Sequence, residues 1–129
     1  MSALSLLLSD DLLDASRVTT TARASNLQVK QVRSFQQLLI DLRSSPVPCL
    51  LLDLHHPELR LDELFFALET LTDRPRLIGF GSHVDAARLK AARQAGLDQV
   101  MPRSQFFEEV LTALPKWLGG ENSTRESGS

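Results

Sequence analysis

The sequence predicts an α/β fold in which one parallel sheet is covered by helices on both faces. Short apolar segments alternate along the chain with longer segments of helical periodicity, and we count five of each. A length of 129 residues suits one domain. A hydrophobic content of 43 % is enough for a buried core and too high for a disordered chain. Right-handed crossovers then favour a doubly wound three-layer arrangement.

The first two strands and helices are predicted before Pro46. The apolar run over residues 3–8 has the length of a buried strand. The next helix can end at Asn26. Its apolar positions are Leu12, Ala15, Val18 and Ala22. Residues 27–32 alternate like a strand with one less buried face, and Ser34 can cap the helix that follows.

The central strand is predicted over residues 48–54, because this run is apolar on both faces, as strands of a covered parallel sheet are. Apolar positions over residues 61–71 indicate a third helix, which the segment 73–75 breaks. Residues 76–80 form the fourth predicted strand, which ends at Gly81.

The fourth helix is predicted after Gly81, and the fifth helix is predicted after a short fifth strand at residues 99–101. Ser82 and Asp85 have the spacing of a capping box, and Gly96 is the expected stop. The apolar positions of this helix are Val84, Ala87, Ala91 and Ala95. Ser104 is predicted to cap the last helix, which Pro115 should kink or soon end. Its predicted buried positions are Phe106, Phe107, Val110, Leu111 and Leu114. The domain is expected to span residues 3–118, and residues 119–129 are expected to be a disordered tail.

Composition excludes several classes of partner. Fourteen Lys and Arg against sixteen Asp and Glu give a net charge of −2, which offers no electrostatic case for nucleic acid or an anionic membrane. No apolar run approaches the ~20 residues of a membrane span, and no secretory signal is evident. Cys49 is the single cysteine, so it is expected to be a buried apolar residue rather than part of a disulfide or thiolate metal site. We therefore expect a cytoplasmic protein.

Polar side chains gather after the predicted strands, where doubly wound folds have their binding sites. Asp10, Asp11 and Asp53 would bring three carboxylates to one sheet edge, where their repulsion and their hard oxygens favour Mg²⁺. Arg103 follows the fifth strand and could hold a phosphoryl group. The alternative is that Asp10, Asp11 and Ser82 are helix caps and that Arg103 is a surface residue. A zinc site at Asp53 with His55 and His56 lacks a further histidine cluster at ligand spacing, so a packed or half-exposed His56 is favoured instead.

Three stretches carry a resemblance to a known family. Residues 6–11 (LLLSDD) match a first strand that ends in an acidic pair. Residues 50–57 (LLLDLHHP) match a third strand whose phospho-accepting Asp precedes a proline by four residues, and residues 91–96 (AARQAG) match the end of a fourth helix. In this order and spacing they resemble the receiver domains of bacterial two-component response regulators, including the single-domain chemotaxis receiver, over about residues 4–118. The resemblance implies a flavodoxin-like sandwich with strand order 2-1-3-4-5.

The resemblance also implies a site. Mg²⁺ would be held by Asp10, Asp11, Asp53 and the backbone carbonyl of His55, as in the family. Asp53 would attack a phosphoryl group and become an acyl phosphate, with the metal offsetting the negative charges that meet there. The family's lysine position falls on Arg103, which keeps the positive charge.

The sequence departs from the family at the switch. The family's Thr or Ser falls on Gly81 and its aromatic residue falls on Val100, so the alignment lacks both the hydroxyl and the ring of the usual switch. A slip of one residue could place Ser82 at the hydroxyl position. Ser104 stands where a proline usually follows the lysine, and Pro102 precedes Arg103 instead.

The resulting expectation is a stand-alone signalling module that is phosphorylated on Asp53 with Mg²⁺ by a histidine kinase or phosphotransfer protein. A separate output protein would bind it, with the last helix and Trp117 as one candidate surface; the alternative for Trp117 is terminal packing. The first rival is a pseudo-receiver, which acts as a protein–protein interaction module without phosphorylation. The second is a small Mg²⁺-dependent phosphohydrolase or phosphate binder, which the lack of a cap insertion disfavours. Catalysis is expected to extend at most to autophosphorylation and autodephosphorylation.

Overall fold

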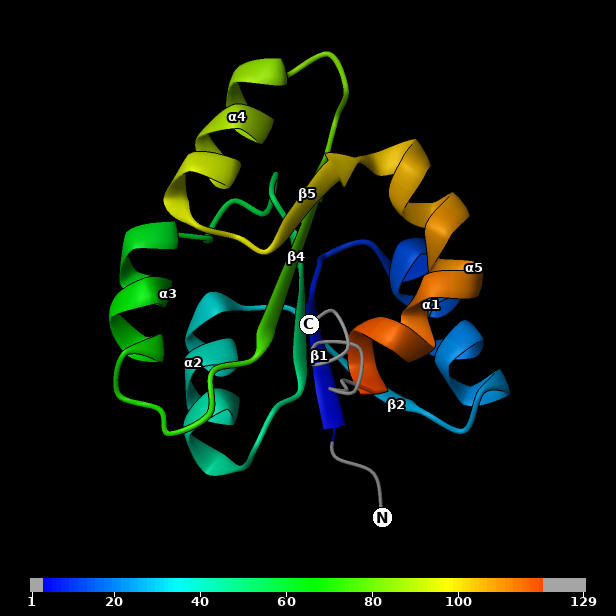
Figure 1. Cartoon of the computed structure of the whole chain (residues 1–129), viewed down its shortest axis with the longest axis horizontal. Helices are drawn as coiled ribbons and strands as arrows, with labels where there is room; N and C mark the ends of the chain where they lie inside the picture. Colours follow the sequence, from blue (N-terminus) through cyan, green and yellow to red (C-terminus); the bar gives the residue numbers. More distant parts are fainter. Residues whose placement is uncertain (1–3, 120–129) are drawn as a thin grey trace, which may run out of the picture.

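The computed structural model describes residues 4–119, in which five strands alternate with five helices (Figure 1). Their bounds are β1 Leu4–Leu8, α1 Leu12–Ala24, β2 Gln28–Val32, α2 Phe35–Ser44, β3 Cys49–Asp53, α3 Leu61–Leu68, β4 Arg76–Gly81, α4 Ala86–Ala95, β5 Gln99–Pro102 and α5 Arg103–Gly119. All strands pair in parallel in the order β2-β1-β3-β4-β5. The predicted fold class and strand order are therefore confirmed. Of the predicted tail, only residue 119 lies within the described residues, as the last residue of α5.

The sheet separates two hydrophobic cores. Figure 1 shows α2, α3 and α4 on one face of the sheet and α1 and α5 on the other. Successive side chains of β3 point to opposite faces, so Leu50 and Leu52 join the first core while Cys49 and Leu51 join the second. All four are fully buried. This two-sided burial is what the apolar run predicted.

Aromatic side chains fill the core between the sheet and α5. The ring of Phe106 stacks on that of Phe80 at 4.2 Å between centroids and on that of Trp117 at 5.7 Å. Phe107 meets both phenylalanine rings edge-on. Trp117 is only 2 % exposed, so it is a packing residue and its interpretation as a partner-binding residue was wrong.

Helix α4 begins later than predicted. Its N-cap is Asp85, whose carboxylate accepts from the Arg88 N–H at 3.1 Å. Ser82 instead lies in the preceding turn, where the Asp85 N–H donates to its carbonyl. The side of the helix that faces the sheet also differs from the predicted one. Leu89 and Ala92 are buried, whereas the predicted positions Val84, Ala87, Ala91 and Ala95 are exposed.

The ends of α1 and α4 follow the sequence, whereas the start of α5 does not. Asn26, at a φ of 60°, and Gly96, at a φ of 115°, both adopt the left-handed backbone that ends α1 and α4. Helix α5 starts at Arg103, directly after β5, so Ser104 lies within its first turn and is not the cap. It continues through Pro115 to residue 119. Leu12 and Leu111, predicted to be buried, are exposed.

None of the helices in residues 4–119 combines the length and the apolar character that a membrane crossing needs.

The aromatic core generates a prediction about stability. Replacing Phe106 by alanine leaves a cavity among three other rings, so we expect the free energy of unfolding to fall by about 3–5 kcal/mol. Leu111→Ala on the same helix is the matched control, because Leu111 is 68 % exposed; it should change stability by less than about 0.5 kcal/mol. Urea unfolding followed by circular dichroism measures both values. Equal losses in the two variants would contradict this account of the core.

Burial of Cys49 generates a second prediction. Desolvation raises the pKa of its thiol from 9.0 to about 12, so the thiolate needed for reaction is scarce in the folded protein. We expect a thiol-reactive disulfide reagent to leave Cys49 unmodified at about pH 8 and to react fully once denaturant is added. The unfolded chain ionises first as the pH rises, so this thiol should lower stability between its unfolded and folded pKa values. Rapid labelling of the native protein would show that the thiol is accessible.

Candidate functional site

The candidate site lies at the carboxyl ends of the strands. Leu8 pairs with Leu52 in the β1–β3 register, so the acidic pair after β1 and Asp53 at the end of β3 reach the same edge of the sheet. Gly81 ends β4, and its register partner Pro102 ends β5. The topology thus brings the predicted site residues to one edge, as expected for a doubly wound sheet.

The three carboxylates at this edge have different neighbours. Asp53 is half-buried, and its Oδ1 accepts from the His55 N–H at 2.9 Å. Asp11 is the N-cap of α1, where its carboxylate accepts from the Asp14 N–H at 3.0 Å. The side chain of Asp10 is 51 % exposed, with Oδ1 3.4 Å from Nε2 of His56. The cap interpretation therefore holds for Asp11, but Asp10 faces an imidazole.

The donor types suit Mg²⁺, but their arrangement does not. Carboxylate oxygens are the ligands that Mg²⁺ prefers. Within residues 4–119, however, no three His, Cys, Asp or Glu side chains converge closely enough to hold a metal ion. In this arrangement the Asp11 carboxylate caps α1, and the Asp53 carboxylate accepts from a backbone N–H of its own loop. Asp10, Asp11 and Asp53 thus do not form a fitted metal site here.

His56 joins three loops at this edge. Its Nδ1 accepts from the Glu58 N–H at 3.1 Å, and its Nε2 lies 2.8 Å from the Arg33 carbonyl oxygen. These partners are those of the neutral tautomer that carries its proton on Nε2, which donates to the carbonyl. The ring is buried and both nitrogens are engaged, so the packed interpretation of His56 is confirmed and a zinc-ligand role is not supported.

His55 occupies the space beside Gly81. A Cβ atom at Gly81 would lie 3.1 Å from His55 Nε2 and 3.2 Å from Leu89 Cδ2, closer than ordinary contacts. The Ser82 N–H donates to the same Nε2 at 2.9 Å. The Ser82 hydroxyl accepts from the Val84 N–H at 3.3 Å within its own turn. The imidazole thus joins the β3–α3 loop to the β4–α4 loop, a role for His55 that sequence reasoning missed.

Arg103 is paired with a residue that the sequence analysis did not select. Its guanidinium forms a salt bridge with the Oδ1 of Asp14 on α1. Asp14 is only 3 % exposed, and its Oδ2 has no hydrogen-bond partner within residues 4–119. The guanidinium groups of Arg103 and Arg17 both lie over the Phe107 ring, at 5.1 and 4.3 Å from its centroid. The signal for this pair was present, because Asp14 lies on the same helical face as Val18.

Comparisons with known proteins identify the fold. No family model matches the chain, and no curated protein matches it. A response regulator from Hahella chejuensis gives a TM-score of 0.77 at 17 % identity, over 91 % of this chain and 96 % of its own. A signal receiver domain from Bermanella marisrubri gives a TM-score of 0.75 at 20 % identity. The match covers 91 % of this chain and 98 % of that domain. The receiver domain of a sensor histidine kinase from Pseudomonas aeruginosa PAO1 gives a TM-score of 0.74 at 16 % identity. The match covers 93 % of this chain and 100 % of that domain, which has magnesium coordinated in its active-site cleft.

These matches extend over nearly the whole of each chain, and their TM-scores of 0.74, 0.75 and 0.77 show a shared backbone arrangement. At such low identities the likeness concerns the backbone and assigns no role to individual side chains of this chain. The chain has the fold of a response-regulator receiver domain, as its three motifs predicted.

Proposed function

We propose that this chain is a receiver-type signalling module that acts through contact with a partner protein and does not require phosphorylation. The observation that carries this proposal is the hydrogen bond from the Ser82 N–H to His55 Nε2, which joins the β4–α4 loop to the β3–α3 loop beside Gly81. A phosphorylation switch needs a group beside the phosphoryl acceptor that can respond to it. Here Gly81 supplies no hydroxyl, and an imidazole fills the neighbouring space.

Two further contacts support a module without the usual switch. The Ser82 hydroxyl, the candidate substitute, is bound to the Val84 N–H. Arg103, the candidate phosphate contact, is bound to the buried carboxylate of Asp14. Drawing Arg103 toward a phosphoryl group would leave that carboxylate buried without its counter-charge, which is costly. Arg103 is therefore held by α1, and the Ser82 hydroxyl already accepts one hydrogen bond within its own turn.

The last helix offers a surface for a partner. A shallow hollow of ≈ 580 Å³ lies between α1 and α5. Leu111, which is exposed, supplies apolar surface there, and Arg17 and Glu108 supply one charge of each sign, since Arg103 is paired with Asp14. An apolar side chain flanked by polar groups has the chemistry that fits this surface. We propose that the partner is a cytoplasmic protein. It would contact the exposed part of α5 around Leu111, because Trp117 on the same helix is buried.

Phosphorylation of Asp53 is the second candidate function. The observation that favours it is the place of Asp53 at the end of β3, beside the strand that the acidic pair follows. In this candidate a histidine kinase or phosphotransfer protein supplies the phosphoryl group, with Mg²⁺ at Asp10, Asp11, Asp53 and the His55 carbonyl. The side chains of Asp10 and Asp11 would first have to leave the partners described above. The related receiver domain from Pseudomonas aeruginosa does hold magnesium in its cleft.

A spectroscopic titration separates the two functions. Amide NMR spectra would be recorded for the protein alone, with Mg²⁺, and with Mg²⁺ plus beryllofluoride, which mimics an aspartyl phosphate. We expect no saturable shifts at Asp53, Gly81 or β5, because the residues present do not form a fitted metal site. Asp53→Asn, the matched control, should give the same result.

Saturable shifts in the wild-type protein that disappear in the folded Asp53→Asn variant would overturn the first proposal. They would support phosphorylation at Asp53. Shifts that persist in Asp53→Asn would show that the additives bind elsewhere and would leave the assignment of Asp53 unsupported.

The loop contact itself can be tested through hydrogen exchange. His55→Ala removes the acceptor of the Ser82 N–H, so we expect that amide to exchange about two- to tenfold faster, the effect of losing about 1 kcal/mol of hydrogen bonding. His83→Ala is the matched control, because His83 is an exposed neighbour in the same loop. Unchanged exchange in His55→Ala would show that the imidazole does not hold the loop.

A further inference from the structure

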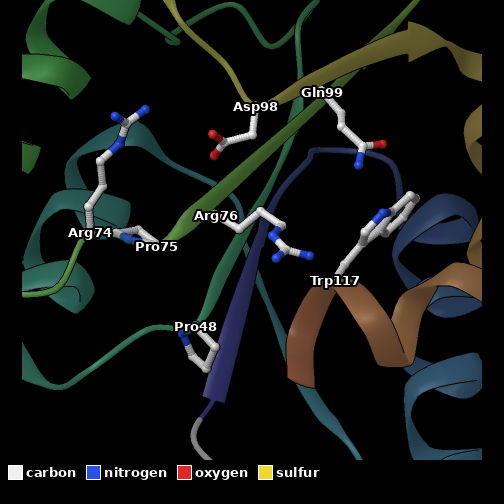
Figure 2. Close-up of a pocket in the computed structure, with 7 residues that line it drawn as sticks. All are labelled: Pro48, Arg74, Pro75, Arg76, Asp98, Gln99 and Trp117. Atoms are coloured by element: carbon white, nitrogen blue, oxygen red, sulfur yellow. The ribbon is translucent and has the colours of Figure 1, made fainter. Parts of the chain in front are cut away.

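A second hollow lies at the opposite end of the sheet from Asp53 (Figure 2). Arg76 and Gln99 line it and are the first residues of β4 and β5, whereas Asp53 and Gly81 are the last residues of their strands. Its volume is ≈ 450 Å³, within the range of small-molecule sites. The hollow is therefore a separate place from the candidate site of the proposed function.

The polar lining of this hollow carries net positive charge. It contains Arg74, Arg76 and Asp98, and neither arginine has a carboxylate within 4.0 Å among residues 4–119. Arg76 donates to the Lys116 carbonyl oxygen at 3.1 Å, and Arg74 donates to that of Gly96 at 3.3 Å. A guanidinium has five N–H donors, so both arginines keep most of theirs for another acceptor.

The one carboxylate of the lining is held by the backbone. Asp98 Oδ2 accepts from the Leu77 N–H at 2.7 Å. In Figure 2 this carboxylate is directed toward the side of Arg74, away from the guanidinium of Arg76. It therefore does not neutralise Arg76, whose charge is available to an incoming group.

Three side chains face a common space in the hollow. Figure 2 shows the guanidinium of Arg76, the amide of Gln99 and the indole of Trp117 directed toward one another across it. The backbones of Arg76 and Gln99 lie in paired strands, and the carbonyl of Lys116 holds the Arg76 guanidinium. The Arg76 donor, held in this way, loses little conformational entropy when a ligand binds.

We propose that this hollow binds a small organic oxyanion, a carboxylate or a phosphate, with Arg76 and Gln99 as its donors. The planar fork of a guanidinium matches both carboxylate and phosphate oxygens. The carbon skeleton of the ligand would lie against Pro48 and against the small exposed parts of Pro75 and Trp117, which are otherwise buried. The two arginines attract an anion to the rim of the hollow. Only Arg76 faces the amide of Gln99 and the indole of Trp117, which would surround the anion.

Trp117 provides the signal for a direct test, because it is the only tryptophan of the chain and lines the hollow. Its fluorescence would be followed while the intact protein is titrated with inorganic phosphate, pyrophosphate or citrate, with potassium chloride matching the ionic strength. We expect a saturable change with at least one of these anions at up to about 10 mM. Saturation with phosphate or pyrophosphate alone identifies a phosphate ligand, and saturation with citrate alone identifies a carboxylate.

Substitutions connect the signal to the donors. Arg76→Gln should weaken binding about ten- to a hundredfold, the usual effect of losing charged hydrogen bonds. Arg93→Gln is the matched control, because Arg93 also donates to a backbone carbonyl, that of Val100 at 3.3 Å, but does not line the hollow. Gln99→Ala, at an exposed position, gives a second test of the donor set in case Arg76→Gln does not fold.

Several outcomes would overturn the proposal. One is the absence of any saturable response to the three anions. Another is an equal loss of affinity in Arg93→Gln and Arg76→Gln, which would indicate a general effect of charge. Unchanged affinity in both Arg76→Gln and Gln99→Ala would place the anion elsewhere. Asp53→Asn should bind the anion like the wild type, so the failure of this proposal and that of the proposed function are distinguishable.

Discussion

Burial of β3 on both faces is the constraint on which the rest of the structure depends. A strand of five residues that presents Leu50 and Leu52 to one side and Cys49 and Leu51 to the other must be covered twice. Each neighbouring strand must then be reached by a helical crossover, which makes the sheet parallel and directs all its carboxyl ends to one edge. The place of Asp53 at that edge is therefore a consequence of hydrophobic burial.

Polar groups near the two cores are stabilised by partners from other elements. The buried ring of His56 satisfies both nitrogens with the loops after β2 and β3, and the carboxylate of Asp14 on α1 is met by Arg103 on α5. These contacts offset the desolvation that burial imposes. The second of these contacts also holds Arg103, the candidate phosphate contact, on the side of α1.

The two edges of the sheet differ in which polar side chains remain available to bind a ligand. At the carboxyl edge, His55 binds the loop beside Gly81, and Asp11 caps a helix. At the amino edge, Arg76 donates to one carbonyl oxygen and no carboxylate neutralises it among the described residues. An arginine without a carboxylate partner among residues 4–119, Arg76, thus lies at the opposite edge of the sheet from Asp53, beside Trp117.

Local pattern alone determined the fold class, the order of elements and the position of Asp53, because apolar periodicity is set by which faces a segment must bury. Tertiary structure decided the rest. Ser82 and Asp85 are both competent caps, and only the length of β4 and the turn after it selected Asp85. Arg103 bears the charge expected of a phosphate contact, but its partner depends on how α1 packs against α5. The filling of the space beside Gly81 by His55 could not be predicted either, because it joins residues 26 positions apart whose contact exists only once β3 and β4 are paired.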